Sequence, residues 1–215
     1  MTLTVALQMD PLESIDISTD SSFVLGLEAL RREYKLSHSL PRHMSFTGGR
    51  GEGNGSAQIC ARARALTLRR EKGNHATLGV FEIRELAEFD VILMRQDPPF
   101  DMAYITATHM LERIHPATFV VNDPIEVRNA PEKLFVSHFG DLMPPTLISS
   151  SCDEIAAFRA EYKDLIVKPL FGNGGSGVFH IGPDDENLSA LIEMFTGRSN
   201  EPIIVQRYLP QVREG

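Results

Sequence analysis

The segment at residues 89–94 (FDVILM) places the strongest single constraint on the fold. Its last four residues are consecutively apolar and leave no face of a strand for water, so the segment predicts a central strand buried on both faces. A second apolar run, at residues 3–8, ends at Asp10 and Pro11. Buried strands of this kind deliver their carboxyl ends to loops, where ligands tend to bind in open α/β sheets.

Helices are predicted between these strands. Asp20 is an N-cap candidate for a helix that follows the first strand, and Asp101 is one for a helix that follows the second. Residues 118–121 predict a further short strand. Strands that alternate with helices favour a parallel sheet. We therefore predict the α/β class, with a parallel-sheet, Rossmann-like domain at residues 1–128.

A smaller α+β domain is predicted at residues 129–215. Asn129 with Glu132, and Ser151 with Glu154, have the spacing of a capping box at the start of a helix. The periodicity of the apolar residues predicts strands at residues 165–167, 178–181 and 202–206, and a helix over residues 188–195.

A region rich in Gly, Ser, Asn and Arg lies between residues 45 and 75. Its glycines at positions 48–55 predict a mobile surface loop, and residues 57–68 predict an exposed hairpin. The arginines at positions 62 and 64 also fit a basic strand that binds an anion. A solvated face accounts for the same pattern.

Charge and composition exclude several classes of protein. The formal net charge is −8, which opposes a nucleic-acid partner, and no apolar run has the length of a membrane span. The chain has two cysteines far apart, Cys60 and Cys152, which indicates reduced thiols in a cytoplasmic protein rather than a disulfide framework. None of the seven histidines has a metal-binding spacing, so no metal site is predicted in this chain.

A glycine-rich loop at residues 171–177 (FGNGGSG) lies between two predicted strands. Glycines let a backbone approach a ligand closely and turn its amides toward phosphate oxygens, although a flexible hairpin tip has the same composition. Lys168 stands at the end of the preceding strand, where its ammonium group can meet the same phosphates. The lysine and the loop together favour a nucleotide site.

Five motifs occur in one order along the chain, and together they resemble the bacterial glutathione synthetases, which are ATP-grasp ligases. They are MDP at residues 9–11, RQDPPFD at 95–101, EKLF at 132–135, KPL at 168–170 and QRYLP at 206–210. In this resemblance, residues 1–128 are the substrate-side domain that precedes the ATP-grasp domain. Residues 129–215 are then the first, incomplete part of the ATP-grasp domain itself.

The resemblance implies a set of ATP-binding residues. Lys133 and Lys168 match the two nucleotide lysines of the family, and Tyr208 and Leu209 match the backbone positions that adenine contacts. The expected ATP-binding set is Lys133, Lys168, Gly172, Asn173, Gly174, Gly175, Ser176, Gly177, Gln206, Tyr208 and Leu209.

The motif at residues 95–101 resembles the loop that borders the peptide substrate in the family. A guanidinium group such as that of Arg95 holds a carboxylate with two parallel donors. The residues expected to bind the peptide substrate are Asp10, Ser21, Arg95 and Asp97. The alternative for Arg95 is a structural salt bridge with Asp97.

The activity that the resemblance implies is ATP-dependent ligation of glycine to γ-glutamylcysteine through an acyl phosphate, with Mg²⁺ as the metal. In the family, the metal ligands and the arginine that contacts the acyl phosphate come from sequence that would follow Gly215. We therefore expect no complete catalytic set within these 215 residues and no activity from them alone. A homo-oligomer, with the tetramer of the family as the model, is also expected.

Two other functions remain open at this stage. One is a different ATP-grasp carboxylate-amine ligase, such as a glutamate-adding enzyme, and the other is a non-catalytic fragment that binds nucleotide or assists assembly. The chain departs from the family pattern at Phe171, which replaces an acidic residue, at Asn173 within the loop, and at the apparent insertion of residues 48–55.

Overall fold

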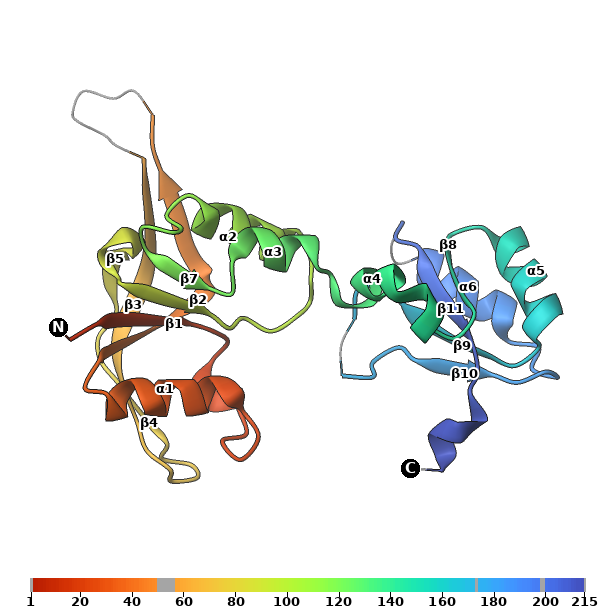
Figure 1. Ribbon diagram of the computed structural model, residues 1–215, viewed down its shortest axis with the longest axis horizontal. Coiled ribbons are helices and arrows are strands. Elements are labelled where there is room, and N and C mark those ends of the chain that lie inside the picture. The colour runs from red at the N-terminus through yellow and green to blue at the C-terminus, as the bar shows by residue number, and fades with distance from the viewer. Residues whose placement is uncertain (1, 50–56, 173, 198–199, 215) are drawn as a thin grey trace. The chain divides into compact units, whose positions relative to one another are not determined.

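The computed structural model describes residues 2–49, 57–172, 174–197 and 200–214, and it divides into two compact units. Unit 1 comprises Met1–Asn129 and unit 2 comprises Ala130–Gly215. Each unit has its own sheet and its own hydrophobic core (Figure 1). No helix in the described ranges combines the length and the apolar character that crossing a membrane requires.

Unit 1 is built on a mixed sheet. Its strands are β1 (Thr4–Gln8), β2 (Lys35–Thr47), β3 (Gln58–Leu68), β4 (Ala76–Leu78), β5 (Glu82–Glu85), β6 (Val91–Met94) and β7 (Phe119–Val121). Its helices are α1 (Ser21–Arg31), α2 (Met102–Glu112) and α3 (Pro124–Asn129), with the 3-10 turns η1 (Leu12–Ser14) and η2 (Leu86–Glu88).

The described strands of this sheet follow the order β4-β3-β2-β1-β6-β7, and β5 also pairs with β3. The strands β2, β1, β6 and β7 are parallel, as the alternation of strands and helices predicts. The pairings of β3 with β2, β4 and β5 are antiparallel, which the sequence does not predict. The strand β1 lies between β2 and β6. After β1 the chain forms β2 to β5 on one side of it, and then forms β6 and β7 on the other side.

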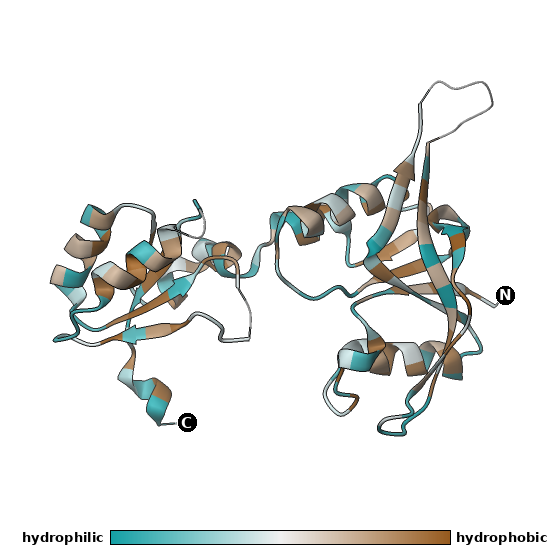
Figure 2. Ribbon diagram, turned by 180° about the vertical axis from the view of Figure 1, so that it is seen from behind, coloured by the Kyte–Doolittle hydropathy of each residue, from teal (hydrophilic) through white to brown (hydrophobic). Residues whose placement is uncertain are grey.

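Residues on the two faces of β1 enter two different cores. Val5 and Leu7 pack in the cluster that includes Ala29 of α1, whereas Ala6 packs in the cluster that includes Leu111 of α2. The strand is therefore covered by helices on both faces, as Figure 1 shows, and β6 is the strand that its apolar run predicts. Figure 2 shows hydrophobic residues in brown on the strands of both units.

The prediction for residues 45–75 is partly wrong. Residues 45–47 belong to β2, and residues 58–68 form one long strand, β3, rather than a hairpin of their own. Alternate residues of β3 are buried, including Ile59, Ala61 and Ala63, so this strand is part of the sheet and not a solvated arm. Residues 50–56 of the predicted loop lie outside the described residues.

Unit 2 contains an antiparallel sheet that has four strands within the described residues, in the order β10-β9-β11-β8. Its strands are β8 (Thr146–Ser149), β9 (Leu165–Pro169), β10 (Phe179–Ile181) and β11 (Ile203–Arg207). Its helices are α4 (Glu132–Phe135), α5 (Cys152–Tyr162) and α6 (Leu188–Thr196), with the 3-10 segments η3 (Val136–Leu142) and η4 (Pro210–Arg213).

The two predicted capping boxes of this unit have different outcomes. Asn129 is the last residue of α3, and α4 begins after Pro131 without a side-chain cap, so the prediction at Asn129 is wrong. Ser151 does cap α5 by accepting from the backbone N–H of Glu154 at 3.3 Å. The carboxylate of Glu154 accepts from the hydroxyl of Ser149, which in turn accepts from the backbone N–H of Ser151 at 2.9 Å.

The helices α5 and α6 cover one face of the sheet of unit 2. Val167 of β9 and Val205 of β11 are fully buried in a cluster with Ile155 of α5 and Ile192 of α6. Since side chains alternate along a strand, Lys168 and Gln206 point to the opposite face. Lys168 and Gln206, two of the predicted ATP-binding residues, therefore lie on the face away from α5 and α6.

Candidate functional site

The lysines predicted to bind nucleotide come together in unit 2. The Nζ of Lys133 on α4 donates a hydrogen bond to the carbonyl oxygen of Gly172, the first residue of the glycine loop proper. Burial of the side chain, and next the charge of Lys133, lower the pKa of Lys168 from its ordinary value of 10.5. The two ammonium groups thus repel each other in a partly desolvated place, which favours binding of an anion between them.

The loop that follows β9 has a backbone suited to glycine. Gly174, Gly175 and Gly177 have φ angles of +59°, +75° and +71°, a region that other L-residues seldom adopt. A Cβ on Gly177 would lie 3.1 Å from Pro169 Cδ, so the loop packs closely on the end of β9. Ser176 is exposed, and Asn173 lies outside the described residues.

The predicted adenine-contacting segment follows β11. The backbone N–H of Tyr208 donates to the carbonyl oxygen of Asp164 at 2.9 Å, so it is already committed. The ring of Tyr208 lies against His180 with 4.2 Å between ring centroids, and His180 Nε2 lies 2.6 Å from Asp164 Oδ1. Among the described residues no partner is recorded for the N–H of the exposed Leu209. The carbonyl of Tyr208 and the N–H of Leu209 therefore remain for a ligand.

Gln206 is held within the sheet. Its Nε2 donates to the hydroxyl of Thr146 on β8 at 2.9 Å, on the same face of the sheet as Lys168. Four predicted ATP-binding positions, at residues 133, 168, 172 and 206, thus belong to this face or its edge. The sheet register explains the arrangement, because Lys168 is paired with Ile204 and Gln206 lies two residues further along β11.

A cavity of about 260 Å³ lies in unit 1 beyond the carboxyl ends of β1 and β6. Asp10 and Asp97, two of the predicted substrate-binding residues, line it. Asp10 Oδ2 accepts from the backbone N–H of Asp97 at 2.7 Å, which ties the two loops together. Burial, followed by the charges of Asp10 and Asp20, raises the pKa of the Asp97 carboxyl. A cationic group in this cavity would relieve that repulsion.

Arg95 and Ser21 contact each other beside this cavity rather than in its lining. Arg95 Nη2 donates to Ser21 Oγ at 2.8 Å, and Arg95 Nε donates to Ser22 Oγ at 3.1 Å. Both serines lie in the first turn of α1. Within the described part of the chain, no ion pair joins Arg95 and Asp97, so the alternative of a salt bridge between them is wrong.

Sequence reasoning missed further residues of this cavity, among them Gln96, Arg42 and Tyr104. Gln96 lies inside the motif at residues 95–101, two residues beyond β6. The sequence does contain a signal for it, because Gln96 continues the two-residue spacing of the buried Ile92 and Met94. Arg42 comes from β2, a strand that the sequence pattern does not predict.

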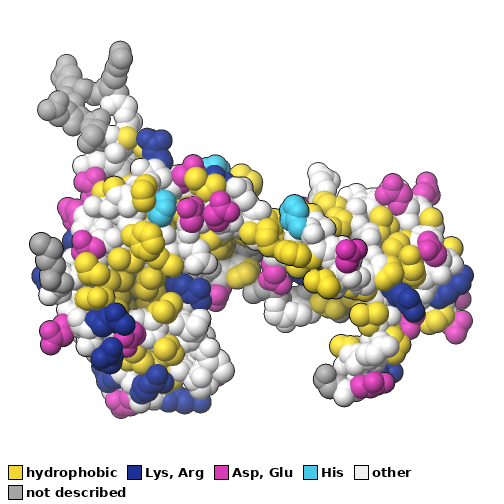
Figure 3. All heavy atoms as spheres, viewed as in Figure 1, with side chains coloured by type: hydrophobic (Ala, Val, Ile, Leu, Met, Phe, Trp, Pro, Cys, Tyr) yellow, Lys and Arg dark blue, Asp and Glu magenta, His cyan; other side chains and the backbone are white. Residues whose placement is uncertain are grey.

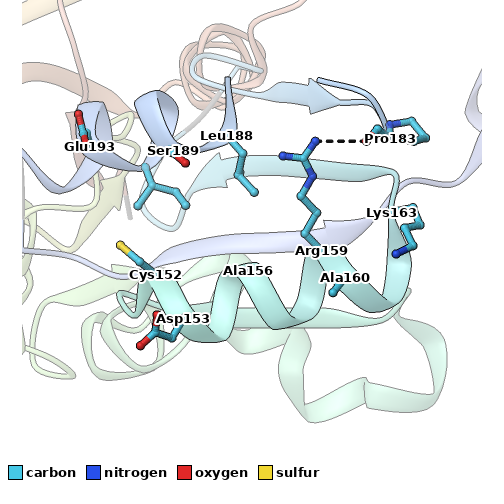
Figure 4. A pocket seen from close by; sticks show the side chains of 11 residues that line it. Cys152, Asp153, Ala156, Arg159, Ala160, Lys163, Pro183, Leu188, Ser189 and Glu193 are labelled. Carbon is cyan, nitrogen blue, oxygen red and sulfur yellow. Dashed lines mark hydrogen bonds between the residues drawn. The ribbon is translucent and has the colours of Figure 1, made fainter. Parts of the chain in front are cut away.

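A larger cavity, of about 560 Å³, lies between α5 and α6 on the covered face of unit 2 (Figure 4). Figure 4 shows Arg159 extending from α5, and its guanidinium donates to the carbonyl oxygens of Gly182 and Pro183. None of the predicted site residues lines this cavity. Over the described ranges, no three His, Cys, Asp or Glu side chains are grouped so that they could hold a metal ion.

Hydrophobic side chains gather at the surface of α4 and η3, where Figure 3 shows them in yellow. The exposed residues there are Leu134, Phe135, Val136, Phe139 and Leu142. Lys133 precedes these residues on α4, is only partly exposed, and donates to the carbonyl oxygen of Gly172.

Comparison with solved structures supports the fold. A RimK domain protein ATP-grasp from Sphaerobacter thermophilus aligns with a TM-score of 0.59 at 17% identity, covering 96% of this chain and 64% of that one. The D-alanyl-alanine synthetase A from Vibrio cholerae aligns with a TM-score of 0.56 at 16% identity, covering 97% of this chain and 59% of that one. At such identities the likeness establishes the ATP-grasp fold alone.

Sequence comparison identifies the family. Residues 3–128 match the model of the prokaryotic glutathione synthetase N-terminal domain, and residues 132–215 match that of its ATP-grasp domain. A glutathione synthetase from Mesorhizobium japonicum is 53% identical over 215 residues, and one from Yersinia pestis is 42% identical over 208 residues. The chain covers 66% and 63% of these relatives, about two thirds of their length, while 100% and 96% of it is matched. The chain thus belongs to the prokaryotic glutathione synthetase family.

Proposed function

We propose that this chain carries the nucleotide-binding and peptide-binding residues of a glutathione synthetase, which joins glycine to γ-glutamylcysteine at the expense of ATP. In this proposal unit 1 is the substrate-side domain and unit 2 is part of the ATP-grasp domain. The observation that carries the proposal is the convergence of Lys133, Lys168 and the Gly172 backbone in a family whose members bear this name.

The triphosphate of ATP fits the charge at this place. Lys168 is partly buried beside Lys133, and burial, followed by the charge of Lys133, lowers its pKa by more than the nearby carboxylate of Glu132 raises it. Phosphate oxygens would supply negative charge and accept hydrogen bonds from both ammonium groups and from loop amides. The loop residues Gly174, Gly175, Ser176 and Gly177 then cover the phosphates. Three of them are glycines, which have no side chain to keep the backbone away from the phosphates.

Adenine fits the segment after β11. An amino group on the base would donate to the carbonyl of Tyr208, and a ring nitrogen would accept from the N–H of Leu209. The bond from Tyr208 N–H to Asp164 and the contact of its ring with His180 would hold the segment in place for this pairing. Gln206, fixed by Thr146, completes the wall on the sheet side.

The cavity of unit 1 is proposed to receive γ-glutamylcysteine. Its carboxylates at Asp10 and Asp97 match the ammonium group of the dipeptide, and the raised pKa of Asp97 is lowered again when a cation binds. Arg95 and Ser21 border the cavity and are proposed to contact the carboxylate end of the dipeptide. One guanidinium nitrogen of Arg95, Nη1, has no recorded partner among the described residues and is left for this contact.

The reaction that we propose has two steps. A carboxylate oxygen of the dipeptide attacks the γ-phosphorus of ATP, and the bond from that phosphorus to ADP breaks, which gives an acyl phosphate. The amine of glycine then attacks the acyl carbon, phosphate leaves, and the amine gives up a proton. Lys133 and Lys168 lower the barrier by holding the charge on the phosphates, and pre-placed donors of this kind are a major source of catalysis.

Mg²⁺ is the metal that ATP-grasp ligases use with ATP, and it supplies charge neutralisation at the phosphates when bound. The described residues hold no cluster of carboxylates for it, so the proposal assigns it no ligand among them. We further propose that the protein acts in the cytoplasm as a homo-oligomer. The two cysteines are free, one partly exposed and one exposed, which agrees with a reducing compartment.

A ligase assay tests this proposal on the protein as its gene encodes it. Phosphate release from ATP is measured with γ-glutamylcysteine and glycine together, and with each omitted, and the product is identified by mass. We expect release that needs both substrates and yields the tripeptide. Release with glutamate as acceptor but not with glycine would replace this function by that of a glutamate-adding ligase. No dependence on either amine would leave nucleotide binding alone.

A further inference from the structure

Two buried amide side chains meet at the carboxyl ends of β1 and β6. Gln8 is the last residue of β1 and is 1% exposed, and Gln96 follows β6 by two residues and is 8% exposed. Gln8 Nε2 donates to Gln96 Oε1 at 3.0 Å. The strand β1 is flanked on both sides by parallel strands, β2 and β6, so the pair lies at the switch point of the sheet, where ligands bind in open α/β folds.

The contacts of this pair determine which atom of Gln96 is left without a partner. Met44 Sδ lies 3.2 Å from Gln8 Nε2 and is a weak acceptor, so it requires the nitrogen of Gln8 on its side. The same nitrogen of Gln8 then donates to Gln96, so the atom of Gln96 that accepts is Oε1. As a result, Gln96 Nε2 is buried without a hydrogen-bond partner among the described residues, and so is Gln8 Oε1. Buried donors are nearly always paired, so an orphaned one at a switch point needs an explanation.

The side chain of Gln96 lines the cavity of about 260 Å³ that also holds Asp10 and Asp97. The same cavity is lined by Arg42 and by Tyr104, so it combines carboxylates, a guanidinium group, a phenol and an amide. Such a lining suits a molecule with both an ammonium group and several acceptor oxygens. A zwitterionic dipeptide has this chemistry, whereas a nucleotide, which carries negative charge throughout its phosphates, does not match the carboxylates.

We propose that Gln96 is a specificity-determining residue for the dipeptide, and that its Nε2 donates to a carboxylate or carbonyl oxygen of the bound molecule. Gln8 is a positioning residue, since it holds Oε1 of Gln96 and thereby turns Nε2 away from itself. This inference rests on the proposed function and adds to it a residue that recognises the substrate. Gln96 Nε2 has a hydrogen-bond acceptor in the complex and none in the free protein. The dipeptide therefore binds at a place where the free protein has an unsatisfied donor.

The test uses two replacements of Gln96 in the protein as its gene encodes it. Gln96→Met keeps the length of the side chain and removes both polar atoms. Gln96→Glu keeps an acceptor for Gln8 and replaces the donor by an oxygen. Gln58→Met is the matched control, because Gln58 is an exposed glutamine of β3 outside the cavity, and its side chain donates a hydrogen bond to the partly exposed Glu85. The KM values for dipeptide and ATP, kcat and Tm are measured for each protein.

We expect Gln96→Met to raise the KM for the dipeptide about ten-fold or more, the size of one hydrogen bond to a charged group. Gln96→Glu should raise it further at neutral pH, because the introduced carboxylate repels the substrate oxygen. Relative to wild type, this second variant should recover as the pH falls, since a protonated carboxyl can donate. The KM for ATP should change by less than about two-fold in both variants, as expected for a contact that the nucleotide does not make.

A purely structural role for Gln96 predicts a different pattern. Tm would fall, both KM values would move together, and the Gln96→Glu variant would show no recovery at lower pH beyond that of wild type. That pattern, or an unchanged KM for the dipeptide in an active enzyme, overturns the inference and leaves the proposed function intact. A wild-type protein that does not join glycine to the dipeptide overturns the proposed function and the inference together.

Discussion

Replacement of Lys168 by methionine tests the nucleotide site most directly. Methionine fills nearly the same volume without the charge, so the change removes one ammonium group and leaves the packing of β9 in place. A hydrogen bond to a charged group contributes about 1.5–3 kcal/mol, which corresponds to a loss of ATP affinity of roughly ten-fold to more than a hundred-fold. Lys133→Met should cost less, because Lys133 lies on the exposed helix α4 and already donates to Gly172.

The same variant should not destabilise the protein in the absence of ATP. Burial and the charge of Lys133 lower the pKa of Lys168, so its charged form is disfavoured in the folded state. For a basic group whose folded pKa is lowered, the unfolded chain binds more protons between the two pKa values, and stability rises with pH across that range. Below the folded pKa of Lys168 the penalty is fully present. Lys168→Met removes it, and Tm should stay equal or rise.

Isothermal titration calorimetry with ATP and Mg²⁺, together with Tm of the unliganded proteins, measures both quantities. Lys72→Met serves as the control, since Lys72 is an exposed lysine in a loop of unit 1. ATP affinity of the wild type should also decrease at alkaline pH as Lys168 loses its proton, and the variant should lose this dependence. Equal ATP affinity in wild type and Lys168→Met would refute the phosphate-binding role. A large fall in Tm would refute the account of its burial.

Three further predictions concern the substrate side and the core. Asp97→Asn should raise Tm at neutral pH, because the raised pKa of the Asp97 carboxyl means that its charge destabilises the fold at a pH above its folded pKa. The gain in Tm should vanish below pH 3.8, the ordinary pKa of an aspartic acid, and a gain that persists there would contradict the reasoning. Arg95→Met should raise the KM for γ-glutamylcysteine and leave that for ATP nearly unchanged, and a fall in Tm without any change in the KM for the dipeptide would make the bonds to Ser21 and Ser22 its whole role. Ile155→Ala should lower the unfolding free energy by about 2–5 kcal/mol, as for a fully buried aliphatic side chain, and urea titration that gives a loss under about 1 kcal/mol would show that α5 is not part of the core of unit 2.

The elements that the sequence predicts well are those in which local pattern and tertiary packing agree. The run at residues 91–94 is apolar on both faces and becomes the doubly covered strand β6. Asp101 and Ser151 each accept a hydrogen bond from the backbone N–H three residues later, as their spacing predicts. In unit 2, glycine and proline separate the strands, so β9, β10 and β11 begin and end within a residue or two of the expected positions.

The errors arise where tertiary pairing decides. Strand β2 contains Pro41 and several polar residues, so it lacks a clear alternation, and its pairing with β3 has a shift of register between Ser39 and Met44. A proline and a bulge are common where a strand continues past the regular sheet. The side chain of Arg62 is exposed, as a solvated face predicts, but Arg64 is only partly exposed, and both guanidinium groups lie over the ring of Phe81. That contact joins residues far apart and leaves no periodic signal.

The candidate site shows the same division. Lys168 and the glycine loop lie beside the end of β9, so a local pattern is enough to propose them as a nucleotide site. Lys133 lies on α4, away from any strand end, and only the family resemblance indicates it. Gln96 lies within the motif at residues 95–101, but the sequence does not single it out, because its importance depends on Gln8 and Met44, which lie 88 and 52 positions away along the chain. Likewise, that Arg95 bonds to Ser21 rather than to Asp97 depends on where α1 begins relative to β6.

The central place of β1 in the sheet also bears on how the protein folds as it is synthesised. One edge of β1 pairs with β2, which follows it closely in the chain, but the other edge waits for β6, where Val5 pairs with Val91. The ribosome therefore releases the first strand long before its second neighbour exists. Until then, the backbone N–H and C=O groups along one side of residues 5–8 are unpaired, on a strand whose side chains are mostly apolar. Such an exposed strand edge can pair with other chains. The early product of translation is for this reason the form most in need of a chaperone.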